Sequence, residues 1–360
     1  MKQNIMVGCD LHAETMVLKV LGADGKKRTE IYPTGPSGRR QMFKALKEEA
    51  QKAGGLPIYL AYEASGLGFK LYDEATEEGV KCFVLAPTKI EKSVQQRKNK
   101  TDERDAEQLL EIIQCHIWAG KKIPSIWIPD QELRDDRELV RARLELGEES
   151  ARVRVKIRSL LRRYEVKAPA KAGKGWTKGL KSFLGEQSKK SKKLGPQGRK
   201  VLQSLIRQLS ALEDETEILE VGLGELAEKA RYGKPAKKLT ELNGVGLLTA
   251  LVFVTEMGDM GRFRNRRQVG SYLGLAPSVY ESGSSGERKG HITRHGSPRL
   301  RKVLCQAVWA EVRARGRERD VYEKIAEKNP RHKKIAVVAL MRRLAVRMWH
   351  VGLEAQKKAA

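Results

Sequence analysis

The sequence predicts an α/β N-terminal part built on a mixed sheet, followed by a chain that is mostly helical. Two observations carry this prediction. Short apolar or alternating runs, separated by turn residues, recur through the first part of the chain, which is the pattern of strands. Beyond them, apolar residues recur at the three- and four-residue spacing of helices. With 360 residues, 40% of them hydrophobic, the chain can form two or three folded units.

The first part of the chain alternates strands and helices in a definite order. Gly22-Ala23-Asp24-Gly25 is a hairpin turn between the second and third strands. A helix with Met42, Phe43 and Leu46 on one face follows. The expected strands are residues 5–9, 16–21, 28–32, 57–62 and 81–85, and the expected helices are 37–53, one after Gly66, and 101–117. Three antiparallel strands followed by alternating helices and strands is the order of the ribonuclease-H-like fold.

Helical patterns dominate the rest of the chain. Residues 131–164 predict one long helix that can form half of an antiparallel coiled coil, and a further helix is expected at 198–232. Between them, residues 167–200 are rich in lysine and predict a flexible or weakly helical basic insertion. The expected domains are an α/β domain at 1–130, a helical coiled-coil region with this insertion at 131–235, and a mostly helical domain at 236–360.

The chain is strongly basic, with a formal net charge of +26 and a pI near 9.9. An abundant polyanion is the natural partner, and nucleic acid fits better than an anionic membrane surface. The apolar stretch at 246–254 is about half of the roughly 20 residues that span a bilayer, and the N-terminus lacks a signal-peptide core. The four cysteines form no Cys-x-x-Cys pair, which disfavours structural zinc and a disulfide framework. They suit a reducing cytoplasm, where we expect the protein to associate with the nucleoid.

Four acidic residues stand where a ribonuclease-H-like sheet can bring them to one edge. Asp10 ends the first strand and Glu63 ends the fourth, while Asp102 and Asp105 open a helix and face the same side of it. Taken singly, each has an ordinary explanation as a turn or cap residue. Their joint occurrence at these positions predicts a catalytic site. His12 could serve as a ligand or base, but we interpret it as a polar neighbour of the site.

The four carboxylates predict a divalent metal site. Packed together, they would repel one another strongly unless cations lay between them. Hard oxygen ligands with open positions are what Mg²⁺ or Mn²⁺ uses when it also holds phosphate oxygens. Two such ions about 4 Å apart can activate an attacking oxygen and stabilise a leaving one.

The second half of the chain offers sites for phosphate groups. The segment from Leu242 to Ala250 resembles the hairpin of a helix-hairpin-helix element, in which Gly244 and Gly246 permit a tight turn and backbone N–H groups face a phosphate. A plain helix–helix turn is equally consistent with it. Further along the chain, basic residues are spaced through a Gly/Ser-rich loop that leads into a helix. This arrangement indicates contacts with phosphate groups. The predicted nucleic-acid-binding residues are Lys98, Lys100, Gly244, Gly246, Arg288, Lys289, Arg294, Arg299 and Arg301.

Taken together, these motifs resemble the bridge-RNA-guided recombinases that insertion sequences encode, the insertion sequence 110 family of transposases. The four acids match that family's RuvC-like Asp-Glu-Asp-Asp domain in order and context. The C-terminal part resembles the family's transposase domain. Its matching motifs are Asn243-Gly244-Val245-Gly246, Glu256-Met257-Gly258-Asp259, Phe263, Gly274-Leu275-Ala276-Pro277, Ser282-Gly283 and the segment from Gly296 to Arg301.

The resemblance implies transposition by site-specific recombination, with Ser282 as the nucleophile. Ser284 and Ser285 lie close enough to be alternatives. The serine would attack a DNA phosphate to give a phosphoserine intermediate beside carboxylate-bound Mg²⁺. The resemblance also implies a tetramer, a dimer of dimers, in which the two domains of a composite site come from different protomers. A structured guide RNA would pair with donor and target DNA, and no membrane is involved.

A recombinase of this kind needs no ATP, and two other functions are also consistent with the sequence. A phosphoserine conserves the energy of the broken bond, so no ATP is needed, and the chain carries no Gly-x4-Gly-Lys-Ser/Thr motif. The first alternative is a metal-dependent nuclease that resolves DNA junctions with activated water and without a covalent intermediate. The second is a non-enzymatic protein that packages RNA or DNA and whose acids are structural.

Overall fold

The computed structural model describes residues 4–90, 101–173, 175–280, 288–314 and 316–357. The chain divides into two compact units, Met1–Ile128 and Pro129–Ala360, and each is described by itself. The three domains expected from the sequence stay a prediction. No helix among the described residues is both long enough and apolar enough to cross a membrane.

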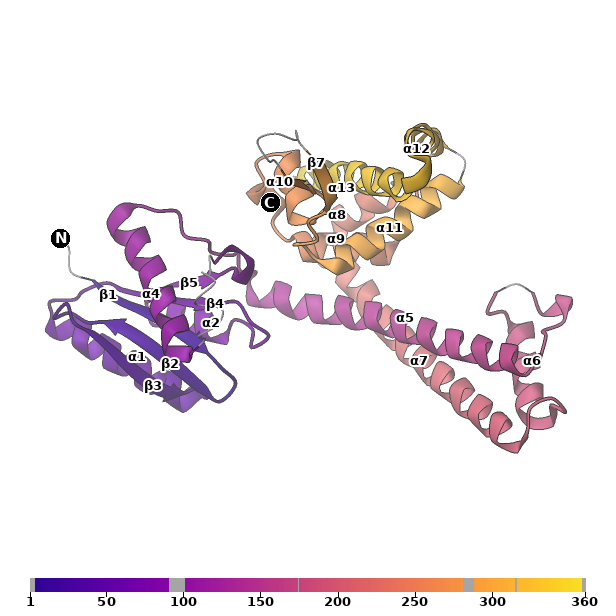
Figure 1. Ribbon diagram of the computed structural model, residues 1–360, viewed down its shortest axis with the longest axis horizontal. Helices are drawn as coiled ribbons and strands as arrows, with labels where there is room; N and C mark the ends of the chain where they lie inside the picture. The colour runs from indigo at the N-terminus through magenta and orange to yellow at the C-terminus, as the bar shows by residue number, and fades with distance from the viewer. Residues whose placement is uncertain (1–3, 91–100, 174, 281–287, 315, 358–360) are drawn as a thin grey trace. The chain divides into compact units, whose positions relative to one another are not determined.

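The first unit is a five-stranded mixed sheet with the strand order β3-β2-β1-β4-β5. Strands β1 (Ile5–Leu11), β2 (Thr15–Leu21) and β3 (Lys27–Pro33) form an antiparallel meander. Strands β4 (Ile58–Glu63) and β5 (Lys81–Leu85) continue the sheet parallel to β1. Along the chain, helix α1 (Pro36–Lys52) follows β3, α2 (Lys70–Glu77) connects β4 to β5, and α4 (Asp102–Ala119) follows β5 (Figure 1). The α/β prediction, its five strands and its three helices are confirmed.

Alternation along β1 assigns the helices to the two faces of this sheet. Ile5, Val7 and Cys9 are buried in one cluster with apolar residues of α1 and α2. Met6 is buried in another cluster with Leu109 of α4. Because successive strand residues point to opposite faces, Gly8 and Asp10 lie on the α4 face with Met6.

Helix α4 lies unusually close to β1, and Gly8 permits this. A Cβ atom built on Gly8 would lie 2.1 Å from the Ala106 carbonyl oxygen and 2.4 Å from the Leu110 nitrogen, both of them backbone atoms of α4. Such distances are far shorter than any real carbon contact, so no residue with a side chain fits without moving the helix. The glycine therefore sets how closely α4 packs on the sheet.

The second unit begins with a long helix pair. Helix α5 (Gln131–Arg163) packs along α7 (Pro196–Glu228), and α6 (Lys178–Lys190) lies at the end of the pair (Figure 1). Buried Leu202, Leu205 and Leu209 follow one another on α7 at intervals of three and four residues, and they share a cluster with apolar residues of α5. This spacing keeps one stripe of α7 facing its partner helix.

The basic stretch at 167–200 is more ordered than the sequence suggests. Helix α6 spans 13 of its residues, and Leu184 is buried against α5 and α7. The guanidinium carbons of Arg154 and Arg158 lie 5.5 and 5.6 Å from the centre of the Trp176 ring. The abundance of lysine concealed a sparse apolar pattern that is sufficient to fix the helix once α5 and α7 offer a surface.

The remainder of the second unit is helical around the largest core of the protein. It contains α8 (Gly233–Thr240), α9 (Leu247–Met257), α10 (Arg266–Tyr272), α11 (Pro298–Arg313), α12 (Arg317–Lys328) and α13 (Lys334–Lys357). Leu133, Val140 and Leu144 from the first half of α5 enter this core. A two-stranded antiparallel sheet, β6 (Pro277–Tyr280) with β7 (Arg288–Ile292), was not expected from the Gly/Ser-rich sequence around it.

Candidate metal and nucleic-acid sites

Asp10 lies near the end of β1 on the face that α4 covers. Its side chain is only 16% exposed. The strand places Asp10 there because it follows Gly8 by two residues, which is one repeat of the pleat. The Asp10 carboxylate thus lies beside the start of α4 and not in open solvent.

The acidic residues in the first turn of α4 make two different kinds of contact. Thr101 caps the helix by accepting a hydrogen bond from the Arg104 N–H, at 3.4 Å. The Lys19 Nζ atom on β2 lies 2.7 Å from Glu103 Oε1, and this contact lowers the pKa of Glu103. Together with an ion pair between Lys27 and Glu107, it fastens α4 to the outer strands of the sheet. Asp102 takes no part in these ion pairs and instead contacts His12, the residue that follows β1.

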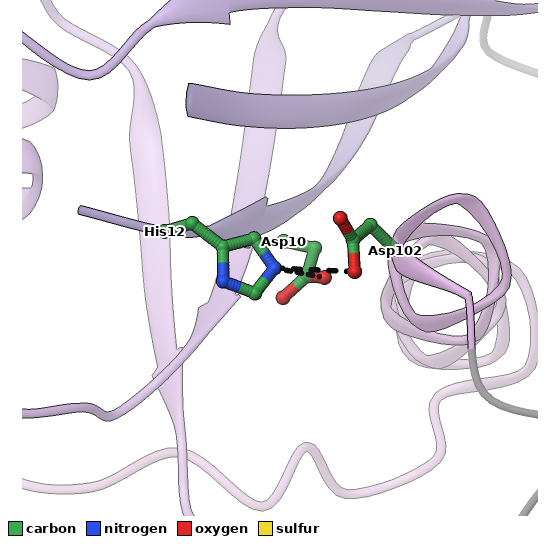
Figure 2. A group of neighbouring side chains, drawn as sticks. All are labelled: Asp10, His12 and Asp102. Atoms are coloured by element: carbon green, nitrogen blue, oxygen red, sulfur yellow. Dashed lines mark hydrogen bonds and ion pairs between the residues drawn. The ribbon is translucent and has the colours of Figure 1, made fainter. Parts of the chain in front are cut away.

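Asp10, His12 and Asp102 form a compact group (Figure 2). The Nε2 atom of His12 lies 3.0 Å from Asp10 Oδ2 and 3.3 Å from Asp102 Oδ1, so one imidazole nitrogen bridges the two carboxylates. One ligand atom from each of the three residues lies within 4.8 Å of the others. Two carboxylate oxygens and an imidazole nitrogen at this spacing can hold a divalent cation.

The surroundings of Asp10 disfavour its charged form. Burial raises the pKa of this carboxyl above its ordinary value, and the nearby charges of Asp105 and Asp102 raise it further. His12 opposes these effects through its charge and its hydrogen bond. Asp105 is therefore within electrostatic reach of Asp10. A cation at this position would relieve both the desolvation and the repulsion of the carboxylates.

Glu63 ends β4, the strand parallel to β1. In that pair Cys9 lies beside Tyr62, so the register brings Glu63 to the same edge of the sheet as Asp10. Among the described residues, the group that could share an ion contains neither Glu63 nor Asp105. The structure thus brings together Asp10 and Asp102 of the four predicted acids. The role of the other two as metal ligands stays a prediction.

His12 is expected from the sequence only as a polar neighbour of the site, whereas the structure shows it in contact with both Asp10 and Asp102. The signal was available, because His12 follows Asp10 by two residues and a strand directs both side chains to one face. The strand itself ends at Leu11, one residue before His12. The imidazole reaches Asp102 because α4 packs so closely on β1.

The predicted phosphate-binding turn lies between α8 and α9. Gly244 has a positive φ of 77°, which glycine adopts freely. A Cβ atom there would lie 2.5 Å from the Ala307 carbonyl oxygen of α11, so packing requires the glycine as well. Gly246 is the N-cap residue of α9 and has open space around it. Backbone conformation and packing therefore explain why residue 244 is a glycine. Gly246 comes directly before the first N–H groups of α9, which are the groups predicted to face a phosphate.

The predicted arginines of the α11 region differ in what they contact. The Arg301 guanidinium donates to the carbonyl oxygens of Leu273 and Gly296, at 3.1 and 2.6 Å, and so supports the turns before α11. Arg299 donates to Glu145 of α5 at 2.9 Å. Arg294 is exposed and adopts a positive φ of 57°. Their contacts to nucleic acid stay predictions.

Several predicted residues fall outside what the structure describes. Ser282 and its neighbours Ser284 and Ser285 lie outside the described residues, in the stretch between β6 and β7. Lys98 and Lys100 also lie outside them. The backbone of Arg288 and Lys289 belongs to β7, but their side chains are not among those described.

A buried arginine joins α5 to the C-terminal helices. Arg137 donates to the backbone carbonyls of Thr255 and Glu256, at 2.8 and 3.0 Å, and so binds the last turn of α9. Arg141, one turn later, pairs with the Glu256 carboxylate at 2.8 Å. The carbonyls at the end of a helix carry partial negative charge, which an arginine satisfies. The motif that begins at Glu256 therefore anchors α5.

Replacing Arg137 by alanine is expected to destabilise the second unit by about 2–4 kcal/mol, because the Thr255 carbonyl loses this donor and the Glu256 carbonyl keeps the Tyr272 hydroxyl but loses the arginine. Urea unfolding followed by circular dichroism measures the change. Arg152→Ala, at a mostly exposed position on the same helix, is the control and should shift the free energy of unfolding by less than about 0.5 kcal/mol. Equal effects of the two substitutions would contradict the anchoring role.

Comparisons with known proteins agree with these features. Residues 236–323 match the family described as "Transposase IS116/IS110/IS902 family", and residues 7–166 match a DEDD-type family of IS110 elements described as "Transposase". A Sinorhizobium fredii protein named as a transposase, y4rJ, is 30% identical over 96% of this chain and 91% of its own length. The transposase for insertion sequence element IS1533 of Leptospira borgpetersenii is 25% identical over 86% of each chain. A second S. fredii protein named as a transposase, y4qE, is 31% identical over 70% of this chain, which spans 58% of y4qE.

The two family matches fall on the two halves of the chain that carry the predicted motifs. The match over residues 7–166 covers the strand of Asp10 and the helix of Asp102, and the match over residues 236–323 covers the glycine turn and the β6–β7 segment. The similarity to y4rJ extends over nearly the whole of both chains. The chain therefore belongs to the IS116/IS110/IS902 family of transposases.

Proposed function

We propose that this protein cuts and rejoins donor and target DNA through a phosphoserine intermediate, in the transposition of an insertion sequence. The observation that carries the proposal is the approach of Asp10 and Asp102, which come from a central strand and from a helix far along the chain. Two carboxylates brought together on the same face of a sheet repel each other unless a positive charge lies near them. Such pairs are typical of functional sites.

The donor set of this site fits Mg²⁺ or Mn²⁺. Asp10 and Asp102 offer carboxylate oxygens, and in this proposal Glu63, at the same edge of the sheet, and Asp105, on the first turn of α4, complete the shell. The bound ion would supply Lewis-acid stabilisation of charge on a phosphate oxygen. His12 holds the two carboxylates in place through its bridging contacts at 3.0 and 3.3 Å. Its imidazole orients the oxygens that face the ion.

Ser282 supplies the nucleophile in this proposal. Its hydroxyl oxygen attacks a DNA phosphorus, a P–O bond to the serine forms, and the bond to one deoxyribose oxygen breaks. The serine proton leaves to a base, and the departing oxygen gains a proton to become a hydroxyl. A hydroxyl of another strand then attacks the phosphorus of the phosphoserine. A P–O bond to that strand forms, the P–O bond to the serine breaks, and the DNA is rejoined without ATP.

Nucleic acid is bound mainly through its backbone. The net charge of +26 supports this, as do the lysines of α6 and the exposed Arg294. If a structured guide RNA pairs with donor and target DNA, the protein needs shape and phosphate contacts more than contacts to base edges. In the same proposal, the carboxylates and the serine of one active site come from different protomers of a dimer of dimers.

Ser282→Ala is the test that separates this mechanism from a water-activated nuclease. We expect strand exchange on paired donor and target DNA to fall by a factor on the order of 10³ or more, because the attacking atom is gone. The covalent protein–DNA complex, trapped by denaturing the reaction, should disappear. Ser284→Ala and Ser285→Ala are matched controls that keep both. Strand exchange retained by Ser282→Ala would eliminate the serine mechanism, and retained cleavage without exchange would favour the nuclease.

A further inference from the structure

Arg294 adopts a backbone conformation that arginine rarely takes. Its φ is 57°, in the left-handed region, and its side chain is exposed in the turn between β7 and α11. A residue with a Cβ atom is strained in that region, whereas glycine enters it freely. Strain of this kind persists where the surrounding packing enforces it, and it is most frequent at functional sites. The presence of an arginine here therefore points to a use of its side chain.

Close packing of two backbone segments fixes this conformation. The Arg294 N–H donates to the Gly274 carbonyl oxygen at 3.1 Å. A Cβ atom on Gly274 would lie 2.9 Å from Arg294 Cα, and one on Gly296 would lie 1.9 Å from the Tyr272 carbonyl oxygen. Glycine thus occupies both neighbouring positions at which the segments cross. Position 294 has an arginine, although its φ favours glycine as well.

The positive charges around Arg294 are only partly neutralised within the chain. Residues 288–310 contain six lysines and arginines and no aspartate or glutamate. Two of the six, Arg299 and Lys302, form ion pairs with acids of α5. Arg294 and Arg301, in contrast, form no ion pair with any residue that the structure describes. These two charges are therefore available to an anion from outside the chain.

The charges of Arg294 and Arg301 act on each other. Burial lowers the pKa of Arg301, and the charge of Arg294 lowers it further. The Arg301 guanidinium cannot easily move away, because it donates to the carbonyl oxygens of Leu273 and Gly296. The backbone of Arg294 is fixed as well. An anion near both side chains would offset their repulsion.

A phosphate group is the anion that fits these features. A guanidinium offers N–H donors in a planar fork, which binds phosphate oxygens through paired, charge-assisted hydrogen bonds. A chain with a net charge of +26 meets phosphate chiefly as the backbone of nucleic acid. Strand β7 connects Arg294 to the stretch of chain that carries the predicted nucleophile Ser282, which favours the DNA strand that is cut.

We propose that Arg294 binds one backbone phosphate of the DNA, with the charge of Arg301 behind it, and so sets the register of the strand that is cut. The identity of this strand rests on the proposed function, whereas the phosphate contact does not. Phosphate contacts fix the position of a protein along a nucleic acid without reading its sequence. Arg294 is thus a substrate-binding residue whose strained backbone serves the reaction and not the fold.

Arg294→Gly separates this role from a structural one, because it removes the charge and the strain together. The melting temperature of the full-length protein, freed of nucleic acid, should equal that of the parent or rise by up to about 4 °C. Affinity for a labelled DNA duplex, measured without added metal, should fall by about tenfold. The slope of log affinity against log salt concentration should become shallower by about 0.9, the contribution of one phosphate. Arg294→Lys keeps the charge and should retain the slope.

Two controls separate strain from charge. Glu165 is the other non-glycine residue with a positive φ among those described, at 48°. Glu165→Gly should therefore affect the melting temperature as Arg294→Gly does, without weakening DNA binding. Arg40→Ala removes an exposed arginine of α1 and so changes the net charge as Arg294→Gly does. It should leave both the affinity and the salt slope unchanged.

The position of cleavage tests the register. On end-labelled DNA, Arg294→Gly should spread the cuts over neighbouring phosphates, and cuts confined to the position of the parent would refute the register role. The phosphate contact is overturned if Arg294→Gly keeps the affinity and salt slope of the parent, or if its melting temperature falls. A change in the binding of structured RNA alone would overturn the assignment to DNA. If the parent binds DNA through Arg294 but cuts none, the proposed function fails and the phosphate contact stands.

Discussion

Asp10→Asn is expected to reduce DNA cleavage by more than about 100-fold while leaving DNA binding unchanged. The substitution keeps the shape of the side chain but removes one charged ligand. Loss of even an outer partner of a metal site costs about 10–100-fold, so loss of a ligand costs more. Binding should persist because it rests on the charge of +26, which the substitution makes more positive. Cleavage of a labelled DNA substrate and its retention on a filter measure the two properties separately.

The stability of this variant gives an independent check. Burial and the neighbouring acids raise the pKa of Asp10 in the folded state, so the ionised carboxylate disfavours folding as the pH rises through that pKa. Without added metal at neutral pH, Asp10→Asn should be as stable as the parent or more stable. The difference should shrink in acid, where Asp10 becomes protonated. A lower melting temperature of the variant would attribute its inactivity to unfolding.

Two controls bracket the Asp10 result. Glu14→Gln changes the charge by the same amount at an exposed site nearby, and cleavage should be unchanged. His12→Ala removes the bridge between the carboxylates but no predicted metal ligand, so a smaller loss of about 10–100-fold is expected. Full cleavage by Asp10→Asn would refute the metal site. The packaging alternative would be the better account only if neither the parent protein nor Asp10→Asn cleaves DNA.

Gly8→Ala is expected to destabilise the first unit by about 3 kcal/mol or more. The added methyl group would overlap the backbone of α4 at Ala106 and Leu110, and a backbone cannot rotate away as a side chain can. Helix α4 must therefore shift or detach. Hydrogen exchange of the β1 and α4 amides in the full-length protein reports the change locally.

This substitution should also abolish cleavage, because α4 carries Asp102. Gly66→Ala is the matched control, since a methyl group there meets nothing within 4 Å and its backbone is not left-handed. We expect its effect on stability to stay below about 0.5 kcal/mol. Normal exchange protection in Gly8→Ala would show that the close packing of α4 on β1 is not essential.

Much of the fold follows from local pattern. Apolar or alternating runs predict the five strands, because four of them bury residues and β3 alternates between half-buried and exposed positions. Helical periodicity predicts α1, α4, α5 and α7. The prediction was incomplete where few residues carry the signal. Helix α6 was obscured by lysines, and the β6–β7 pair by glycine and serine, because sheet pairing depends on a partner strand that a local window does not contain.

The sequence by itself determined the order of elements and the places of Asp10, Glu63, Asp102 and Asp105 at strand ends and a helix start, since these depend on nearest neighbours along the chain. Only the tertiary structure decided which side chains meet. His12 joins Asp10 to Asp102 because Gly8 lets α4 approach β1, and Arg301 supports turns because their carbonyls lie within its reach. Such contacts depend on distances between segments far apart in sequence, and packing sets those distances.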